Sequence, residues 1–313
     1  MSMPQFYVIN NPLAGSGRHQ ETISTIKSQL TFVSWQDTTF AGQATRIAKK
    51  LAKGLPDIPS DNVILAIGGD GTLNEVLNGL LKFKRRNPLP IAYLPNGSGN
   101  DFARAAQLGD PNESLSRLAK IRSSQLLTVG KIVGDAPKKQ TRYFVNNLGI
   151  GFDAAVVSQT NHDRWKVRLN KIGLGSLSYL FSVLKVFTNQ KSFPVTINSG
   201  DDYLNFPRVF LLTLTNHAYF GGGIAILPEA KLTTFGLDLV IAEKMSFAEF
   251  VAMFLALKRN GGHLKFRKVH HIKMSQNASI HVRDIQPGQV DGEELGNGSY
   301  DFQLKFEHYP FWI

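Results

Sequence analysis

The feature that most constrains the fold of this chain is a continuous apolar run that ends in a glycine-rich turn. Residues Asn62–Ile67 read NVILAI, the string Gly-Gly-Asp-Gly-Thr follows at 68–72, and helical spacing follows at Leu73–Phe83. An apolar run without polar alternation is typical of a parallel strand that is buried on both faces. Glycines at the junction of strand and helix allow the backbone to turn sharply. The segment therefore predicts a strand–turn–helix unit of a parallel α/β sheet.

Strand and helix signals alternate over the first part of the chain. Short β-type runs are expected at Gln5–Ile9, Thr31–Thr39 and Pro90–Leu94, and helical spacing is present at His19–Leu30 and Gly42–Lys53. Alternating elements with glycines at the strand ends predict a parallel sheet. We therefore expect an α/β N-terminal domain with a Rossmann-like parallel sheet over residues 1–128.

The pattern changes after about residue 128, where strand-like runs follow one another closely. Only Trp165–Thr188 and Ser246–Leu257 show helical spacing there. Runs of strands with few helices favour antiparallel sheet. We expect a mainly antiparallel, β-sandwich-like C-terminal domain over 129–297, with the closing segment 298–313 returning to the first domain.

Composition narrows the classes of protein and partner. The 313 residues are 42% hydrophobic and include no cysteine, which excludes disulfides and cysteine-ligated metal sites. The net charge of +11 favours an anionic partner such as a nucleotide, a nucleic acid or an acidic membrane. No nucleic-acid-binding fingerprint is present. We expect a cytoplasmic protein, because no signal peptide is recognisable and the apolar stretches are shorter than the roughly 20 residues of a membrane span.

The turn at 68–72 carries the strongest chemical signal. Its exposed N–H groups and the start of the following helix predict a phosphate cradle. Thr72 can cap that helix and donate to a phosphate. Asp70 would repel a polyphosphate unless a cation lies between them, so we expect it to hold Mg²⁺ directly or through water. A tight turn with a capped helix is the simpler alternative.

A second string, Asn-Gly-Ser-Gly-Asn at 96–100, also joins a strand to a helix. Turns at neighbouring strand ends would enclose one crevice, which is where open α/β sheets bind ligands. Ser98 is a candidate phosphate donor there. A capping role alone, through Asn100 or Asp101, remains the alternative.

These strings together resemble the diacylglycerol-kinase catalytic domain, found in bacterial lipid kinases and their sphingosine-kinase relatives. The similarity lies in Asn11-Pro12, in 68–75 and 96–103, and in the second half in Gly-Ile-Gly-Phe-Asp-Ala at 149–154 and Asp-Gly-Glu at 291–293. The resemblance runs from near residue 5 to near 307. It implies a two-domain, ATP-dependent lipid kinase whose active site lies in the cleft, with diacylglycerol or a related lipid as acceptor.

The resemblance also implies roles for particular residues. It places ATP contacts at Asn11, Thr38, Gly68, Gly69, Asp70, Gly71, Thr72, Asn74, Glu75 and Ser98. It places a proton acceptor at Glu293, and a carboxylate is physically suited to take the proton of a weakly nucleophilic hydroxyl. Whether Glu293 or Asp291 is that base stays open, and a plain turn is the alternative for both. Asp153 is similar to a position associated with the lipid headgroup, although a solvated loop acid is nearly as well supported.

One departure concerns an auxiliary metal. Many bacterial members carry an acid that helps to hold a structural Mg²⁺ in the second domain, and Phe235 occupies the corresponding position here. Asp238 is the nearest acid, and its register is off by one. We therefore expect this structural site to be absent or altered, independently of the Mg²⁺ that accompanies ATP.

The route to a lipid is suggested by basic and aromatic residues. Asp163–Lys191 mixes both beside an apolar face, and Lys258–Lys273 is basic without an acid. Such segments suit a peripheral, electrostatic contact with a membrane, whereas a core helix with a solvated rim is the alternative.

Three other functions remain to be weighed. A NAD kinase shares the turn at 68–72, and a non-catalytic lipid- or nucleotide-binding regulatory protein would share the fold. A nucleic-acid partner is not expected. The oligomeric state is open, with a homodimer among the alternatives.

Overall fold

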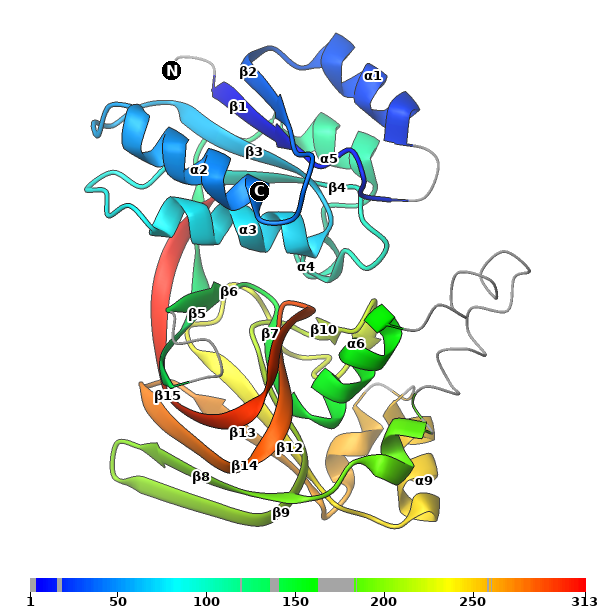
Figure 1. The fold of residues 1–313 in the computed structure, drawn as a ribbon. Helices are drawn as coiled ribbons and strands as arrows, with labels where there is room; N and C mark the ends of the chain where they lie inside the picture. The colour runs from blue at the N-terminus through cyan, green and yellow to red at the C-terminus, as the bar shows by residue number, and fades with distance from the viewer. Residues whose placement is uncertain are drawn as a thin grey trace.

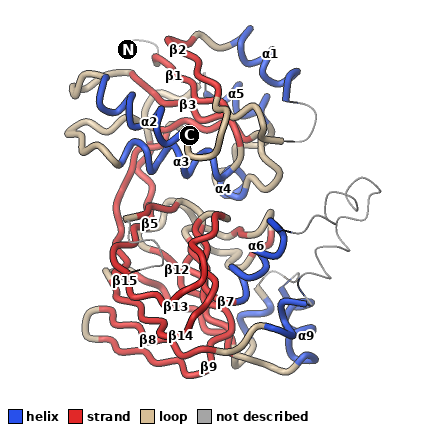
Figure 2. The backbone as a smooth tube through the Cα atoms, viewed as in Figure 1, coloured by secondary structure: helices blue, strands red, loops and turns tan. Residues whose placement is uncertain are grey.

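The computed structural model describes residues 4–15, 19–118, 120–135, 141–162, 183, 185–257, 259 and 261–313. They form two lobes, and both chain ends lie in the upper, N-terminal lobe of Figure 1. In that lobe helices surround a small sheet, whereas strands dominate the lower lobe (Figure 2). The expected α/β N-terminal part and β-rich C-terminal part are thus confirmed.

The N-terminal lobe has a sheet between two layers of helices. Strand β1 pairs in parallel with both β2 and β3, and β3 pairs in parallel with β4. The elements are β1 (Gln5–Asn10), α1 (His19–Gln29), β2 (Phe32–Asp37), α2 (Gln43–Gly54), β3 (Asn62–Gly68), α3 (Asp70–Leu81), β4 (Ile91–Pro95), α4 (Asp101–Ala105) and α5 (Pro111–Leu118).

Strand β3 explains why this lobe needs helices on both faces. All seven of its residues are buried. Ile64 and Ala66 pack into a core formed with α2 and α3, whereas Val63 and Leu65 pack into a second core that includes residues of α1 and α5. Successive side chains of a strand point to opposite faces, so an uninterrupted apolar strand requires a cover on each side.

The C-terminal lobe is built from antiparallel pairs, with β9 next to β7, β8 and β12, and β14 next to β7, β8 and β15. Its elements are β5 (Gln125–Asp135), β6 (Arg142–Phe144), β7 (Asn147–Gly151), α6 (Phe152–His162), β8 (Phe193–Ser199), β9 (Asp202–Thr215), β10 (Tyr219–Phe220), β11 (Ile224–Ala225), β12 (Leu237–Glu243), α9 (Phe247–Leu257), the 3-10 helix η1 (Gly262–Lys265), β13 (Val269–Met274), β14 (Ala278–Val290) and β15 (Glu293–Phe311).

The long strand β15 connects the two lobes. It begins at the turn after β14, pairs with β5 along most of its length, and ends with Phe311 opposite Ile91 of β4. The N–H group of Trp312 donates to the carbonyl of Ile91 at 2.8 Å. The sheets of both lobes are therefore continuous through β15, and the closing residues of the chain lie against β4.

The structure adds helices that the pattern of the sequence did not predict, among them α5 and α6. Helix α6 follows β7 directly, and Gly151 with a φ of 86° makes the turn between them. Valines and a threonine in this segment read as strand by propensity, and packing against the sheet overrides that preference. The predicted helix Trp165–Thr188 lies mostly outside the described residues. Within them, no helix is both long and apolar enough to cross a bilayer.

Candidate active site between the lobes

The Gly-Gly-Asp-Gly-Thr turn begins where β3 ends, and α3 starts within it, at Asp70. A Cβ atom on Gly68 would lie 2.4 Å from Thr72 Oγ1, so only glycine leaves room for this threonine. Thr72 Oγ1 in turn accepts a hydrogen bond from the Asn11 amide at 3.1 Å. The turn thus places the hydroxyl of Thr72 at the carboxyl edge of β1 and β3.

Asp70 joins this turn to the second one. Its two carboxylate oxygens accept the N–H groups of Asp101 at 2.9 Å and Phe102 at 3.2 Å, at the start of α4. Asp101 is itself buried, and its carboxylate accepts the N–H group of Gly222 at 2.9 Å. Burial, together with the nearby charge of Asp70, raises the pKa of Asp101. Two carboxyl groups therefore meet at this end of the crevice.

The two turns touch through their glycines. A Cβ atom on Gly97 would lie 2.4 Å from the Cα atom of Gly69, a distance that no side chain tolerates. Asn100 has a φ of 53°, and its side chain bonds the N–H and C=O groups of Gly97 at 3.0 and 2.9 Å. Asparagine is one of the few residues that adopt this left-handed conformation readily. The second turn is therefore held against the first by its own side chain.

Glu75 orients a third segment. Its carboxylate oxygens accept the N–H groups of Gly42 at 2.8 Å and Ala44 at 3.1 Å, at the start of α2. The loop that precedes α2 carries Thr38, which is buried and whose N–H group donates to the carbonyl of Asn10. The Glu75 carboxylate thus acts as a hydrogen-bond acceptor for backbone N–H groups at the start of α2.

The turn between β14 and β15 approaches from the other lobe. The buried carboxyl group of Asp291 accepts hydrogen bonds from the N–H groups of Val145, Asn146 and Asn147, each at 2.9 Å, and from the Asn74 amide at 2.7 Å. Burial raises the pKa of Asp291 to about 7, although these bonds favour the charged form. Because Asn74 belongs to α3, this cluster links the turn to the N-terminal lobe.

These segments enclose a cavity of about 550 Å³, which we call the interlobe cavity. Asp70 and Glu293 both line it, although they come from different lobes. A Cβ atom on Gly71 would lie 3.9 Å from Glu293 Oε1, so this exposed carboxylate stands beside the first turn. The cavity is lined by Asn11, Leu13, Ala14, Gly15, Thr38, Phe40, Ala41, Ala44, Gly69, Asp70, Gly71, Thr72, Glu75, Gly97, Ser98, Gly99 and Glu293.

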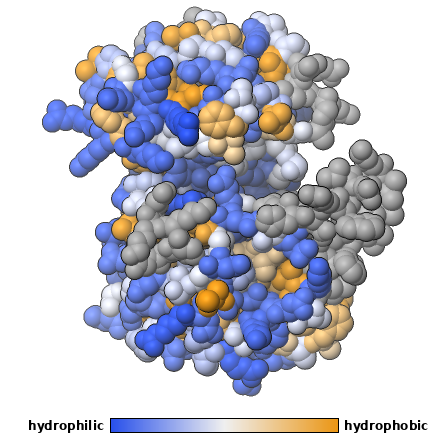
Figure 3. Space-filling model, viewed as in Figure 1, coloured by the Kyte–Doolittle hydropathy of each residue, from blue (hydrophilic) through white to orange (hydrophobic). Residues whose placement is uncertain are grey.

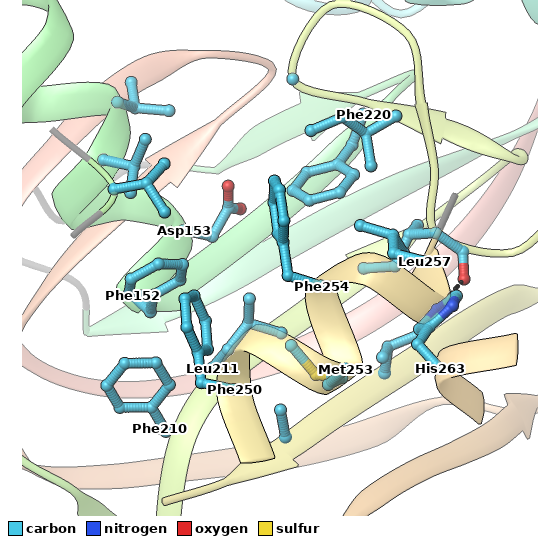
Figure 4. A pocket seen from close by; sticks show the side chains of 18 of the residues that line it. Phe152, Asp153, Phe210, Leu211, Phe220, Phe250, Met253, Phe254, Leu257 and His263 are labelled. Carbon is cyan, nitrogen blue, oxygen red and sulfur yellow. Dashed lines mark hydrogen bonds between the residues drawn. The ribbon is translucent and has the colours of Figure 1, made fainter. Parts of the chain in front are cut away.

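A second cavity of about 430 Å³ extends into the C-terminal lobe, and we call it the aromatic cavity. Phe152, Phe210, Phe220, Phe250 and Phe254 contribute to its wall (Figure 4). Ser98 and Gly99 line both cavities, and Gly292 also lines this one, so the two adjoin at the second turn.

Among the described residues that line the aromatic cavity, Asp153 is the only acidic one. It is buried and accepts a hydrogen bond from the Gln289 amide at 2.8 Å. Burial raises its pKa to about 6. Asp153 is thus a buried acid of the cavity wall, whereas the sequence had left a solvated loop acid as an alternative.

Most of the residues predicted to contact ATP come together in the interlobe cavity, but four of the predicted site residues do not line it, among them Asp153, which lines the aromatic cavity. Gly68 lies behind the turn, where its carbonyl accepts the N–H group of Asn96 at 2.7 Å. Asn74 and Asp291 bond each other in the buried cluster. Sequence reasoning missed the aromatic wall, because its members are scattered between Phe152 and Phe254 and form no local pattern.

The residues at the predicted auxiliary metal position have other contacts. Phe235 stacks on His308 with ring centroids 5.2 Å apart, and Asp238 Oδ1 lies 2.6 Å from His271 Nε2. Among the described residues, no three histidines or acids are grouped as metal ligands. A magnesium ion at Asp70 would therefore take its other ligands from phosphate and water, which is the usual manner of Mg²⁺ in nucleotide sites.

Comparisons with known proteins agree with this geometry. The sequence profile of the diacylglycerol kinase catalytic domain matches residues 5–132, and that of the YegS C-terminal NAD kinase beta sandwich-like domain matches residues 146–307. A diacylglycerol kinase of Staphylococcus saprophyticus is 30% identical over 294 residues, which cover 92% of this chain and 88% of that protein. One of Bacillus subtilis is 28% identical over 318 residues, covering 98% and 95%.

A solved structure shares the fold. The crystal structure of a diacylglycerol kinase from Bacillus anthracis str. Sterne matches with a TM-score of 0.69 at 18% identity, over 100% of this chain and 98% of that one. The profile of the C-terminal domain alone covers more than half of the chain. The chain therefore belongs to the family of diacylglycerol kinases and related lipid kinases, in which a diacylglycerol kinase catalytic domain precedes a YegS-type C-terminal domain.

Proposed function

We propose that this protein transfers the γ-phosphoryl group of ATP to the hydroxyl group of a lipid, with diacylglycerol or a close relative as the acceptor. The observation that carries the proposal is the meeting of Asp70 and Glu293 in one cavity, although they belong to different lobes. Family membership supports the same reaction class.

In this proposal the interlobe cavity holds the triphosphate. The N–H groups of the two glycine turns, with the hydroxyl groups of Thr72 and Ser98, supply donors suited to phosphate oxygens. Each carboxylate oxygen of Asp70 accepts one backbone bond and retains a lone pair. Asp70 is thus suited to hold the Mg²⁺ that would neutralise phosphate charge. The auxiliary structural Mg²⁺ of the second domain is proposed to be absent or altered, since Phe235 replaces its acid.

Glu293 is proposed as the base, in preference to Asp291. Glu293 is exposed in the cavity, whereas Asp291 is buried and its carboxyl group already accepts four hydrogen bonds. The lipid hydroxyl oxygen forms a bond to the γ-phosphorus while the bond to the β–γ bridging oxygen breaks. The hydroxyl proton passes to Glu293, and ADP leaves with the bridging oxygen.

The aromatic cavity is proposed to receive the apolar part of the acceptor. It adjoins the interlobe cavity at Ser98 and Gly99, so a hydroxyl at its entrance would lie near the γ-phosphate. Asp153 provides a carboxyl acceptor in a mainly apolar wall and is suited to a headgroup hydroxyl. NAD as the acceptor is less well matched, since its polar ribose groups would face phenylalanine rings.

The setting of the reaction is part of the proposal. We propose a cytoplasmic enzyme that meets its lipid at a membrane surface through its excess positive charge, without nucleic acid as a partner and with a homodimer left open. The division into residues 1–128 with 298–313, and 129–297, is kept as the proposed domain boundary.

A panel assay tests the proposal. Purified protein is given ATP labelled on the γ-phosphate and mixed micelles that carry diacylglycerol, monoacylglycerol, ceramide or sphingosine, with NAD in a separate reaction. We expect label in a lipid product and its loss in Asp70→Ala and Glu293→Ala. Labelled NADP, or full activity in both variants, would contradict the proposal.

A further inference from the structure

Helix α9 exposes a stripe of large apolar side chains. Phe247, Val251 and Leu255 are 53%, 37% and 57% exposed, and their spacing of four places them on one stripe. Glu249, the helix's one charged residue, is bonded to Ser246 and pairs with Lys268 at 2.9 Å. Helices at a protein surface normally turn polar residues outward, so this stripe requires an apolar partner.

The opposite face of α9 is part of the aromatic cavity. Phe250, Met253, Phe254 and Leu257 all line it, and Figure 4 shows Met253, Phe254 and Leu257 on this helix beside the cavity. On this side, α9 therefore lies between the cavity and the exposed stripe. Whatever covers the outer stripe lies one helix away from the proposed acceptor site.

The charges around the stripe identify the class of partner. No acidic residue occurs between Glu249 and Asp284, whereas Arg259, Lys265 and Arg267 are exposed close to α9 in the chain. Figure 3 shows apolar surface at the edge of the C-terminal lobe where α9 lies. Cations beside an apolar stripe match an anionic lipid leaflet. A second copy of this chain would instead bring like charges together.

The length of α9 sets the depth of contact. Its 11 residues extend about 16 Å, which is about half the thickness of a bilayer core. The helix can thus lie in the interface but cannot cross it.

We propose that α9 is the membrane-docking element of this protein and inserts its Phe247, Val251 and Leu255 stripe into an anionic leaflet. Docking would bring the aromatic cavity next to the acyl chains from which an acceptor lipid is drawn. The purpose of this contact rests on the proposed kinase function, but the contact itself is measurable without it.

A fluorescence experiment tests the contact directly. The chain has no cysteine, so Leu255→Cys provides one labelling position for an environment-sensitive dye. We expect a blue shift with vesicles of phosphatidylcholine and phosphatidylglycerol, and a weaker response with phosphatidylcholine alone or at high salt. The matched control is Ile58→Cys, which is 59% exposed in the other lobe and should show no shift. Equal responses at the two positions would overturn the proposal.

A second experiment separates docking from catalysis. The double variant Val251→Gln with Leu255→Gln should bind anionic vesicles at least about tenfold more weakly, while Ile58→Gln binds normally. Both should phosphorylate a short-chain diacylglycerol below its micelle concentration at the wild-type rate. Unchanged vesicle binding, or dimerisation without lipid that the variant abolishes, would overturn the proposal. Vesicle binding without any lipid phosphorylation by the wild type would support docking and count against the kinase function.

Discussion

Gly97 and Gly69 hold the two glycine-rich turns in contact: a Cβ atom on Gly97 would lie 2.4 Å from the Gly69 Cα atom, and one on Gly69 would lie 3.3 Å from the Gly97 Cα atom. Each glycine lies just after the end of a strand. Because β3 and β4 are paired neighbours, their spacing sets how close the two turns lie to each other. The sequence predicted both turns but could not predict their contact, because the two glycines are separated by a whole helix.

We expect Gly97→Ala to raise the KM for ATP at least about tenfold, because the new methyl group would force the turns apart. The Cβ atom would otherwise lie 2.4 Å from the Gly69 Cα atom. Steady-state kinetics with varied ATP measures the change. Gly54→Ala is the matched control, since no atom lies within 4 Å of its Cβ position. An unaltered KM in Gly97→Ala would contradict the close contact.

Asp153 gives the stability of the fold a pH dependence of known sign. Its folded-state pKa of about 6 lies above its ordinary value of 3.8, so the folded protein holds this proton in a range where the unfolded chain has released it. The group therefore favours the fold at low pH, and that contribution is lost as the pH rises from about 4 through 6.

We expect Asp153→Asn to flatten the pH dependence of unfolding in that range, because the amide does not titrate. Two pKa units correspond to roughly 3 kcal/mol, which bounds how much more the free energy of unfolding changes between pH 4 and 6 in the wild type than in the variant. Urea denaturation at half-unit pH steps measures it. Parallel curves for the two proteins would show that Asp153 titrates normally.

At the scale of elements, the cluster around Asp291 joins three segments that are distant in the sequence. The turn between β14 and β15 carries Asp291, α3 carries Asn74, and the start of β7 supplies the N–H group of Asn147. The cluster fixes where Glu293 enters the interlobe cavity. The cluster therefore acts on Glu293 by positioning its side chain.

Asp291→Ala should lower the free energy of unfolding by roughly 3–5 kcal/mol, because three backbone N–H groups and the Asn74 amide would lose an acceptor in a buried place. Chemical denaturation followed by circular dichroism gives the value. Asp301→Ala is the control, because this aspartate is 68% exposed in its pair with His281 and should change stability by less than about 1 kcal/mol. Equal losses in the two variants would refute the role given to Asp291.

The elements that were predictable from sequence have one strong local signal each. Val63–Ile67 is apolar throughout, because helices cover both faces of β3. Helix α6 was missed because its start depends on Gly151 and on packing against β9 and β14, not on helical spacing. Strand β15 begins at Glu293, before the predicted closing segment 298–313, since its two ends serve different lobes.

The candidate site was predictable to the same extent. Local strings identified Asp70, Ser98 and Glu293, and the structure places all three in one cavity. The cavity in the C-terminal lobe was not predictable, because its wall combines α6, β9 and α9. Residues that are far apart in the sequence form no local pattern, so a wall built from them cannot be predicted from local patterns.

At the scale of the whole molecule, the proposed reaction requires the two lobes to act as one site. Strand β15 starts at Glu293 beside the turns of the N-terminal lobe and ends on β4 of that lobe. The lobes are therefore tied together at both ends of this strand. Asp70 and Glu293 should then serve a single transition state, although Asp70 begins α3 of one lobe and Glu293 begins β15 in the other.

The most direct test measures lipid phosphorylation by Asp70→Asn, Glu293→Gln and the double variant, each checked by circular dichroism for an intact fold. We expect kcat to fall about 100- to 10,000-fold in Glu293→Gln and the double variant to lose little more than the weaker single variant, because residues that act as a unit are not additive. Losses that multiply in the double variant, or wild-type activity in either single variant, would contradict a shared active site.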